Sequence, residues 1–133
     1  MEREKGYAEA LFDLTGKVVL VTGGSRGLGR EMAFAAARCG ADVVVASRKR
    51  ESCETTAAEI EAATGRTAMP YAVHVGRWEE LDGLVDATYE RFGKLDVLVN
   101  NAGMSPIYDK QTDVTQQMFD AVVNLNLKGP FRL

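Results

Sequence analysis

Four short apolar runs, each separated from the next by a longer segment of helical pattern, restrict the fold of this chain more than any other feature. The runs cover residues 17–22, 42–47, 67–75 and 94–100. Continuous apolar runs of this length are typical of strands buried on both faces of a parallel sheet. The run at 67–75 is the weakest, because Pro70 is tolerated only near the start of a strand or at a sheet edge.

The segments between these runs carry apolar residues at helical spacing. Helices are expected over residues 26–39, 51–64 and 77–92, each followed by a glycine of the kind that ends helices. A last helix is expected after Thr115, which is a suitable N-cap residue. Strands and helices that alternate in this way form right-handed crossovers over a parallel sheet. The sequence therefore predicts an α/β fold.

The composition excludes several classes of function. A net charge of −3 without a basic stripe argues against nucleic-acid binding. No apolar run approaches the length of a membrane span, and the charged N-terminus lacks the apolar core of a signal peptide, so we expect no membrane association. Cys39 and Cys53 form no CxxC motif and the chain has one histidine. We therefore expect reduced thiols, a cytoplasmic protein and no metal site.

A glycine-rich stretch joins the first predicted strand to the first predicted helix. Gly23, Gly24, Gly27 and Gly29 lie at the carboxyl edge of the sheet, where open α/β folds bind their ligands. A helix N-terminus offers unpaired N–H groups to a phosphate, and glycine lets the backbone approach closely. The stretch therefore predicts a phosphate-binding loop.

Two common phosphate-binding patterns are absent from this loop. A Walker A motif needs Lys and Ser or Thr where the chain has Arg30 and Glu31. The GxGxxG fingerprint is also missing, and the pattern present is Gly23-x-x-x-Gly27-x-Gly29. A glycine-rich turn that only allows close packing of helix on strand is the alternative interpretation.

Three motifs occur together in the chain: TGGSRGLG at 22–29, NNAG at 100–103 and NLKGPF at 126–131. In these motifs and their intervals the chain resembles the short-chain dehydrogenase/reductase family, from about Phe12 to the last residue. The resemblance implies a Rossmann-type doubly wound parallel sheet, with the first four strands in the order 3-2-1-4. It also implies hydride transfer between a nicotinamide dinucleotide and a small alcohol or carbonyl substrate.

The same resemblance sets expectations for the organisation of the protein. Residues 1–133 would form a single, partial NAD(P)-binding domain, with residues 1–13 as an N-terminal extension. The full-length protein would be a homodimer or homotetramer. The residues expected to bind the cofactor are Gly23, Ser25, Arg26, Gly27, Leu28, Gly29, Ser47, Arg48, Lys49, His74, Val75, Asn100, Asn101, Ala102 and Gly103. For Asn100 to Gly103 a polar turn after a buried strand is the alternative, and both roles are compatible.

The end of the second strand indicates which dinucleotide is bound. NAD-binding Rossmann units usually place a carboxylate here, on the ribose 2′-hydroxyl. This chain has Ser47 followed by Arg48, and Arg26 lies in the glycine loop. Because a guanidinium can hold a 2′-phosphate through paired hydrogen bonds, we expect NADP, with NAD possible. A solvated basic cluster is the alternative.

His74 stands at the end of the third strand, where family members usually have an aspartate that accepts a hydrogen bond from adenine. A neutral imidazole can still accept through one ring nitrogen, and the Val75 amide can contact the ring. A strand-end residue without a binding role is an equal alternative for His74.

Asn126 is the one catalytic residue that the resemblance assigns within the chain, and its role would be to hold a water in a proton relay. An asparagine at a helix irregularity near Gly129 and Pro130 is the alternative. No tyrosine is followed four residues later by lysine, so the family's Tyr-x-x-x-Lys pair and its serine are missing. The chain is therefore expected to be the cofactor-binding half of an oxidoreductase, or else a non-catalytic NADP(H)-binding module complete at this length.

Overall fold

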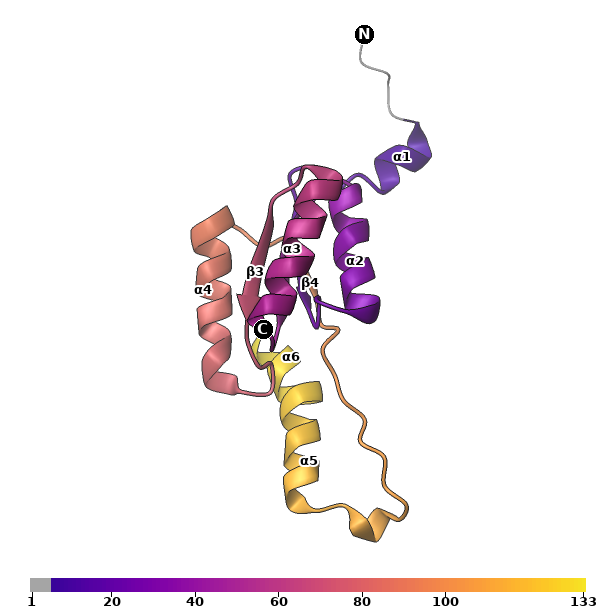
Figure 1. Cartoon of the computed structure of the whole chain (residues 1–133), viewed down its shortest axis with the longest axis vertical. Helices are drawn as coiled ribbons and strands as arrows, with labels where there is room; N and C mark the ends of the chain where they lie inside the picture. The colour runs from indigo at the N-terminus through magenta and orange to yellow at the C-terminus, as the bar shows by residue number, and fades with distance from the viewer. Residues whose placement is uncertain (1–5) are drawn as a thin grey trace.

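The computed structural model describes residues 6–133 and contains a four-stranded parallel sheet (Figure 1). Its strands are β1 (Val18–Thr22), β2 (Asp42–Ser47), β3 (Ala68–Ala72) and β4 (Val97–Val99), in the order β3-β2-β1-β4. Every pair is parallel, with Val21 opposite Val45 on one side and Val99 on the other. The predicted α/β class and strand order are confirmed, and Pro70 lies in the edge strand β3.

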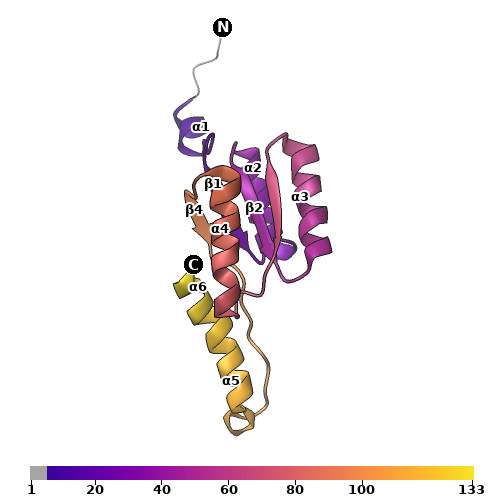
Figure 2. The same ribbon diagram turned by 90° about the vertical axis from the view of Figure 1, so that its left-hand side faces the viewer.

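Helices cover both faces of the sheet. The helices α2 (Gly27–Arg38) and α3 (Arg50–Thr64) lie on one face, and α4 (Leu81–Phe92) lies on the other (Figure 2). Successive residues of a strand point to opposite faces. Thus Val21 and Val45 pack under α2 and α3, while Leu20 and Val44 pack against α4. The two cores explain why β1 and β2 are apolar along their length.

The N-terminal segment stands apart from the sheet. A short helix, α1 (Tyr7–Leu11), has no buried residue and projects beyond the sheet (Figure 1). Of the predicted extension over residues 1–13, residues 1–5 lie outside the described residues. The main body begins at Leu14, whose N–H donates to the Cys39 carbonyl at 2.8 Å.

Several elements differ in length from the predicted ones. β3 ends at Ala72 instead of at residue 75, so His74 lies after the strand. β4 has only three residues instead of seven. Just before it, Asp96 accepts a hydrogen bond from the Val18 N–H and pairs with Lys94 and Lys17. The pKa of Asp96 is lowered, first by the hydrogen bond from Lys94 and then by the one from Val18. The helix expected over 77–92 begins instead with a 3-10 turn, η1 (Trp78–Glu80).

The C-terminal part is one long helical segment preceded by the 3-10 turn η2 (Gln111–Asp113). It consists of α5 (Gln116–Val123), a π-helical turn η3 (Asn124–Lys128) and α6 (Gly129–Arg132). Thr115 caps α5 as predicted, its side chain accepting from the Met118 N–H at 3.2 Å. The helix widens at η3 before Pro130, which has no N–H to donate to the carbonyl four residues earlier.

Among residues 6–133, no helix is both long enough and apolar enough to cross a bilayer.

Candidate functional site

The glycine loop between β1 and α2 contains two kinds of glycine. A Cβ at Gly29 would lie 2.1 Å from the Gly23 carbonyl oxygen and 2.5 Å from Asn101 Nδ2, so Gly29 is required by packing. A Cβ at Gly27 would meet nothing within 4 Å, but the residue has a φ of +55°. Gly27 therefore borders open space, as a phosphate-binding backbone must.

The N-terminus of α2 also faces this open space. Arg26 is the N-cap residue and is extended, and its side chain makes no capping hydrogen bond. The first N–H groups of a helix have no intrahelical acceptor, and the helix dipole places positive charge there. The start of α2 is thus chemically suited to an anion.

The segment after β4 braces the loop from the other side. Asn101 Nδ2 donates to the carbonyl oxygens of Thr22 and Gly23, at 3.1 and 3.2 Å. The buried Thr22 hydroxyl accepts from the Asn101 and Ala102 N–H groups at 3.1 and 3.0 Å. These four bonds tie the ends of β1 and β4 together. The predicted site residues did not include Thr22, although Thr22 is the first residue of the TGGSRGLG motif.

A cleft of about 740 Å³ opens at the carboxyl ends of the strands. Ten of the predicted cofactor residues line it: Gly23, Ser25, Arg26, Ser47, Arg48, Lys49, His74, Val75, Ala102 and Gly103. Gly27, Leu28, Gly29, Asn100 and Asn101 do not line it, although Gly27 lies beside open space and Asn101 braces the loop. The structure adds seven lining residues: Ser52, Val73, Gly76, Met104, Ala121, Asn124 and Leu125.

The basic residues at one end of the cleft lack counter-ions. Within residues 6–133, Arg26, Arg48 and Lys49 form no ion pair, and all three are exposed. Arg30, one turn into α2, behaves differently, because Glu59 and Glu31 pair with it at 2.7 and 3.0 Å. These two carboxylates raise the pKa of Arg30, and the largest cause is the hydrogen bond that Arg30 donates to Glu59. The cleft thus carries concentrated positive charge that no described carboxylate neutralises.

His74 uses one ring nitrogen within the protein. Its Nδ1 accepts from the Gly76 N–H at 3.1 Å, and its own N–H donates to Glu80 Oε2 at 3.0 Å. The pKa of Glu80 is lowered, mainly by the hydrogen bond from the Arg77 side chain and next by the one from the His74 N–H. In a neutral imidazole whose Nδ1 accepts, Nε2 carries the hydrogen. A neutral His74 therefore keeps Nε2–H, a donor, for any further partner in this conformation, whereas the sequence-based hypothesis had the ring accept a hydrogen bond from adenine.

Asn126 lies on η3 and is not a cleft residue. Its Oδ1 accepts from the Met104 N–H at 2.9 Å, and its Nδ2 donates to the Met104 carbonyl at 2.7 Å. The carboxamide thereby holds the loop after NNAG against the helix, 22 residues away in sequence. A second Nδ2 hydrogen and a second Oδ1 lone pair remain for other partners. Asn124, which was not predicted as a site residue, does line the cleft.

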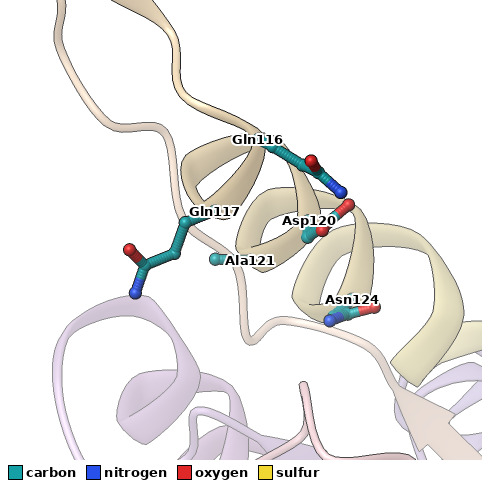
Figure 3. A pocket seen from close by; sticks show the side chains of 5 residues that line it. All are labelled: Gln116, Gln117, Asp120, Ala121 and Asn124. Atoms are coloured by element: carbon teal, nitrogen blue, oxygen red, sulfur yellow. The ribbon is translucent and has the colours of Figure 1, made fainter.

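A second hollow runs along one face of α5 (Figure 3). Its walls are Gln116, Gln117, Asp120, Ala121 and Asn124, and none of these residues was predicted to belong to the site. Among residues 6–133 no three His, Cys, Asp or Glu side chains gather as metal ligands. The cleft at the strand ends, which has the glycine loop and the unpaired cations, is therefore the candidate site.

Comparisons with known proteins agree on one family. The family model described as short chain dehydrogenase matches residues 17–133. A short chain dehydrogenase/reductase of Aspergillus oryzae is 38% identical over 121 residues, which are 91% of this chain and 46% of that protein.

Solved structures give the same result. A short chain dehydrogenase from Burkholderia cenocepacia in complex with NADP has a TM-score of 0.84 and 38% identity, covering 90% of this chain and 48% of that one. L-Sorbose reductase from Gluconobacter frateurii, complexed with NADPH and L-sorbose, has a TM-score of 0.88 and 28% identity. The match covers 92% of this chain and 46% of the reductase. The chain spans about half the length of each of these relatives.

Proposed function

The chain belongs to the short-chain dehydrogenase/reductase family, and we propose that the full protein is an NADP-dependent oxidoreductase. It would transfer hydride between NADP(H) and a small alcohol or ketone. Two similar structures hold NADP or NADPH, which supports this cofactor. Residues 1–133 would form part of its cofactor-binding domain, with residues 1–13 as an extension.

The observation that carries the cofactor assignment is the set of unpaired cations beside Ser47. Arg26, Arg48 and Lys49 line the cleft without counter-ions within residues 6–133, and β2 ends in a hydroxyl instead of a carboxylate. A 2′-phosphate would supply the missing negative charge and accept hydrogen bonds from the guanidinium groups. A carboxylate, which would repel that phosphate, is absent from the end of the strand. NAD would bind more weakly, since it lacks this charge.

The remaining cleft residues fit the other parts of a dinucleotide. The uncapped start of α2 and the open space at Gly27 would hold the pyrophosphate. His74 and Val75, which follow β3, line the cleft and would contact the adenine. Ala102 and Gly103 also line it and, with the neighbouring Asn100 and Asn101, would follow the ribose. When bound, the cofactor supplies or accepts the hydride. Asn126 would act near the reacting groups by holding the Met104 loop and a water.

The activity is proposed for the full protein and not for these residues alone, because no Tyr-x-x-x-Lys pair occurs among them. We place the protein in the cytoplasm, acting on small molecules and not on nucleic acid. We also propose a homodimer or homotetramer. Its support is the helical segment α5–α6, where Phe119, Leu127 and Phe131 are 60%, 64% and 82% exposed, since soluble proteins usually cover such side chains.

Measuring both cofactors against a charge reversal tests the proposal. The unmutated full-length protein should bind NADPH at least about tenfold more tightly than NADH, since a hydrogen bond to a charged group contributes about 1.5–3 kcal/mol. Arg48→Asp should narrow or reverse this preference. Arg50→Asp is the matched control, because Arg50 is an equally exposed neighbour outside the cleft. Equal dissociation constants for NADPH and NADH in the unmutated protein would contradict the proposal.

A further inference from the structure

A chain of three small polar side chains runs from the cleft wall into the core. Ser25 Oγ lies 2.7 Å from Ser47 Oγ, and Ser47 Oγ lies 3.1 Å from Cys53 Sγ. The two serines line the cleft, whereas the Cys53 side chain is fully buried in α3. This chain joins the glycine loop, the end of β2 and α3 at the point proposed for the 2′-phosphate.

The hydrogens of this chain can point in two directions. Each serine hydroxyl and the thiol carry one hydrogen. In the inward arrangement Ser25 donates to Ser47, Ser47 donates to the Cys53 sulfur, and the thiol donates to the carbonyl oxygen of Tyr71 or Ser47. In the outward arrangement Cys53 donates to Ser47 and Ser47 donates to Ser25, so the Ser25 hydrogen is left for the cleft.

The chemistry of the ligand favours the outward arrangement. The 3.1 Å between Cys53 Sγ and Ser47 Oγ fits either direction, and the thiol can also donate to the carbonyl oxygens of Tyr71 and Ser47, at 3.5 and 3.7 Å. A dianionic phosphate can only accept hydrogen bonds, so it selects the arrangement that leaves a hydrogen on Ser25. Hydrogen bonds that point the same way along a chain also polarise and strengthen one another. A ribose 2′-hydroxyl can both donate and accept, so it fits either arrangement.

We propose that Cys53 is a positioning residue for cofactor specificity: its thiol donates to Ser47, Ser47 donates to Ser25, and the Ser25 hydroxyl is thereby left as the donor toward a 2′-phosphate. The inference rests on the proposed NADP-dependent function and goes beyond it, since Cys53 lies outside the cleft and cannot touch the cofactor. Because a ribose 2′-hydroxyl fits either arrangement and a phosphate fits only one, replacing Cys53 should weaken NADPH binding more than NADH binding.

The test compares dissociation constants of NADPH and NADH for variants of the full-length protein. Cys53→Ala should weaken NADPH binding about fivefold, the value of one net hydrogen bond, and NADH binding less than about twofold. Cys53→Ser, which keeps a donor and an acceptor, should restore the NADPH preference. Ser25→Ala, at a half-buried loop position where folding is not at risk, should lower the NADPH preference as Cys53→Ala does.

Thr88→Val is the matched control. Thr88 is also a fully buried hydroxyl, but it lies on α4 on the other face of the sheet and donates to the Leu84 carbonyl at 2.8 Å. This variant should lower the melting temperature and leave the ratio of the two constants unchanged.

The outcomes separate the two proposals. An unmutated protein without NADPH preference would overturn the proposed cofactor and this inference with it. Three results would overturn the role of Cys53 alone. The NADPH preference could persist in folded Cys53→Ala, it could persist in Ser25→Ala, or it could fall as far in Cys53→Ser as in Cys53→Ala.

Discussion

Exchanging Gly29 for alanine should damage the fold itself, whereas the same exchange at Gly27 should damage ligand binding. The Cβ of an alanine at position 29 would lie 2.1 Å from the Gly23 carbonyl oxygen and 2.5 Å from Asn101 Nδ2. Ordinary contacts of a Cβ begin at 3.4 Å, so the glycine loop and the start of α2 must separate by more than an ångström. That movement breaks the brace that Asn101 makes to the loop.

The loss of stability in Gly29→Ala has two sources, the steric overlap and the broken hydrogen bonds. Inserting a methyl group into a filled space costs about 1–3 kcal/mol, and the two hydrogen bonds from Asn101 Nδ2 contribute about 1 kcal/mol each. Gly29→Ala should therefore lower the free energy of unfolding by about 3–5 kcal/mol. A domain has only about 5–15 kcal/mol in total. Gly27→Ala meets no neighbouring atom and should lose only the cost of a left-handed backbone, about 1–2 kcal/mol.

Urea unfolding of the full-length protein, with and without NADPH, measures both effects. Without ligand, Gly29→Ala should unfold at a much lower urea concentration than Gly27→Ala. With NADPH, Gly27→Ala should gain little stability, because its methyl group occupies the space proposed for the pyrophosphate. Equal losses of stability in the two variants, or a full stabilisation of Gly27→Ala by NADPH, would refute these assignments of the two glycines.

Two further predictions concern the loop clamp and the acid stability of the protein. Asn126→Asp places a carboxylate oxygen where Nδ2 donates to the Met104 carbonyl. Turnover should fall by about a hundredfold, the size of a lost proton-transfer contribution, while NADPH affinity should be largely kept. Unchanged turnover would remove Asn126 from the mechanism. Glu80 has a pKa lowered from 4.5, first by Arg77 and then by the His74 N–H. Its carboxylate therefore stabilises the fold above about pH 4.5, and that contribution disappears as the pH falls through the lowered pKa. Glu80→Gln should melt at a lower temperature than the unmutated protein at pH 7, and the difference should close in acid. A difference that grows in acid would contradict this sign.

The class of the fold, and the edge of the sheet at which the candidate cleft opens, could be predicted from the sequence, because local rules govern both. The strands β1 and β2 are apolar along their length, since both of their faces are covered. The helices α3 and α4 end at Gly65 and Gly93, which have φ values of +69° and +74° that favour glycine. A phosphate-binding loop follows from glycines placed between a buried strand and a helix, and a parallel sheet puts that junction at the ligand-binding edge.

The tertiary structure decided which polar groups are used inside the protein and which face the cleft. Thr22 became part of the site because it binds two N–H groups about 80 residues away. Asn126 became a clamp on Met104, and the Nδ1 atom of His74 was taken by Gly76. A hydroxyl, carboxamide or imidazole can donate or accept in several directions. Its role is therefore set by the partners that the fold brings within about 3 Å, and no local pattern in the sequence specifies them.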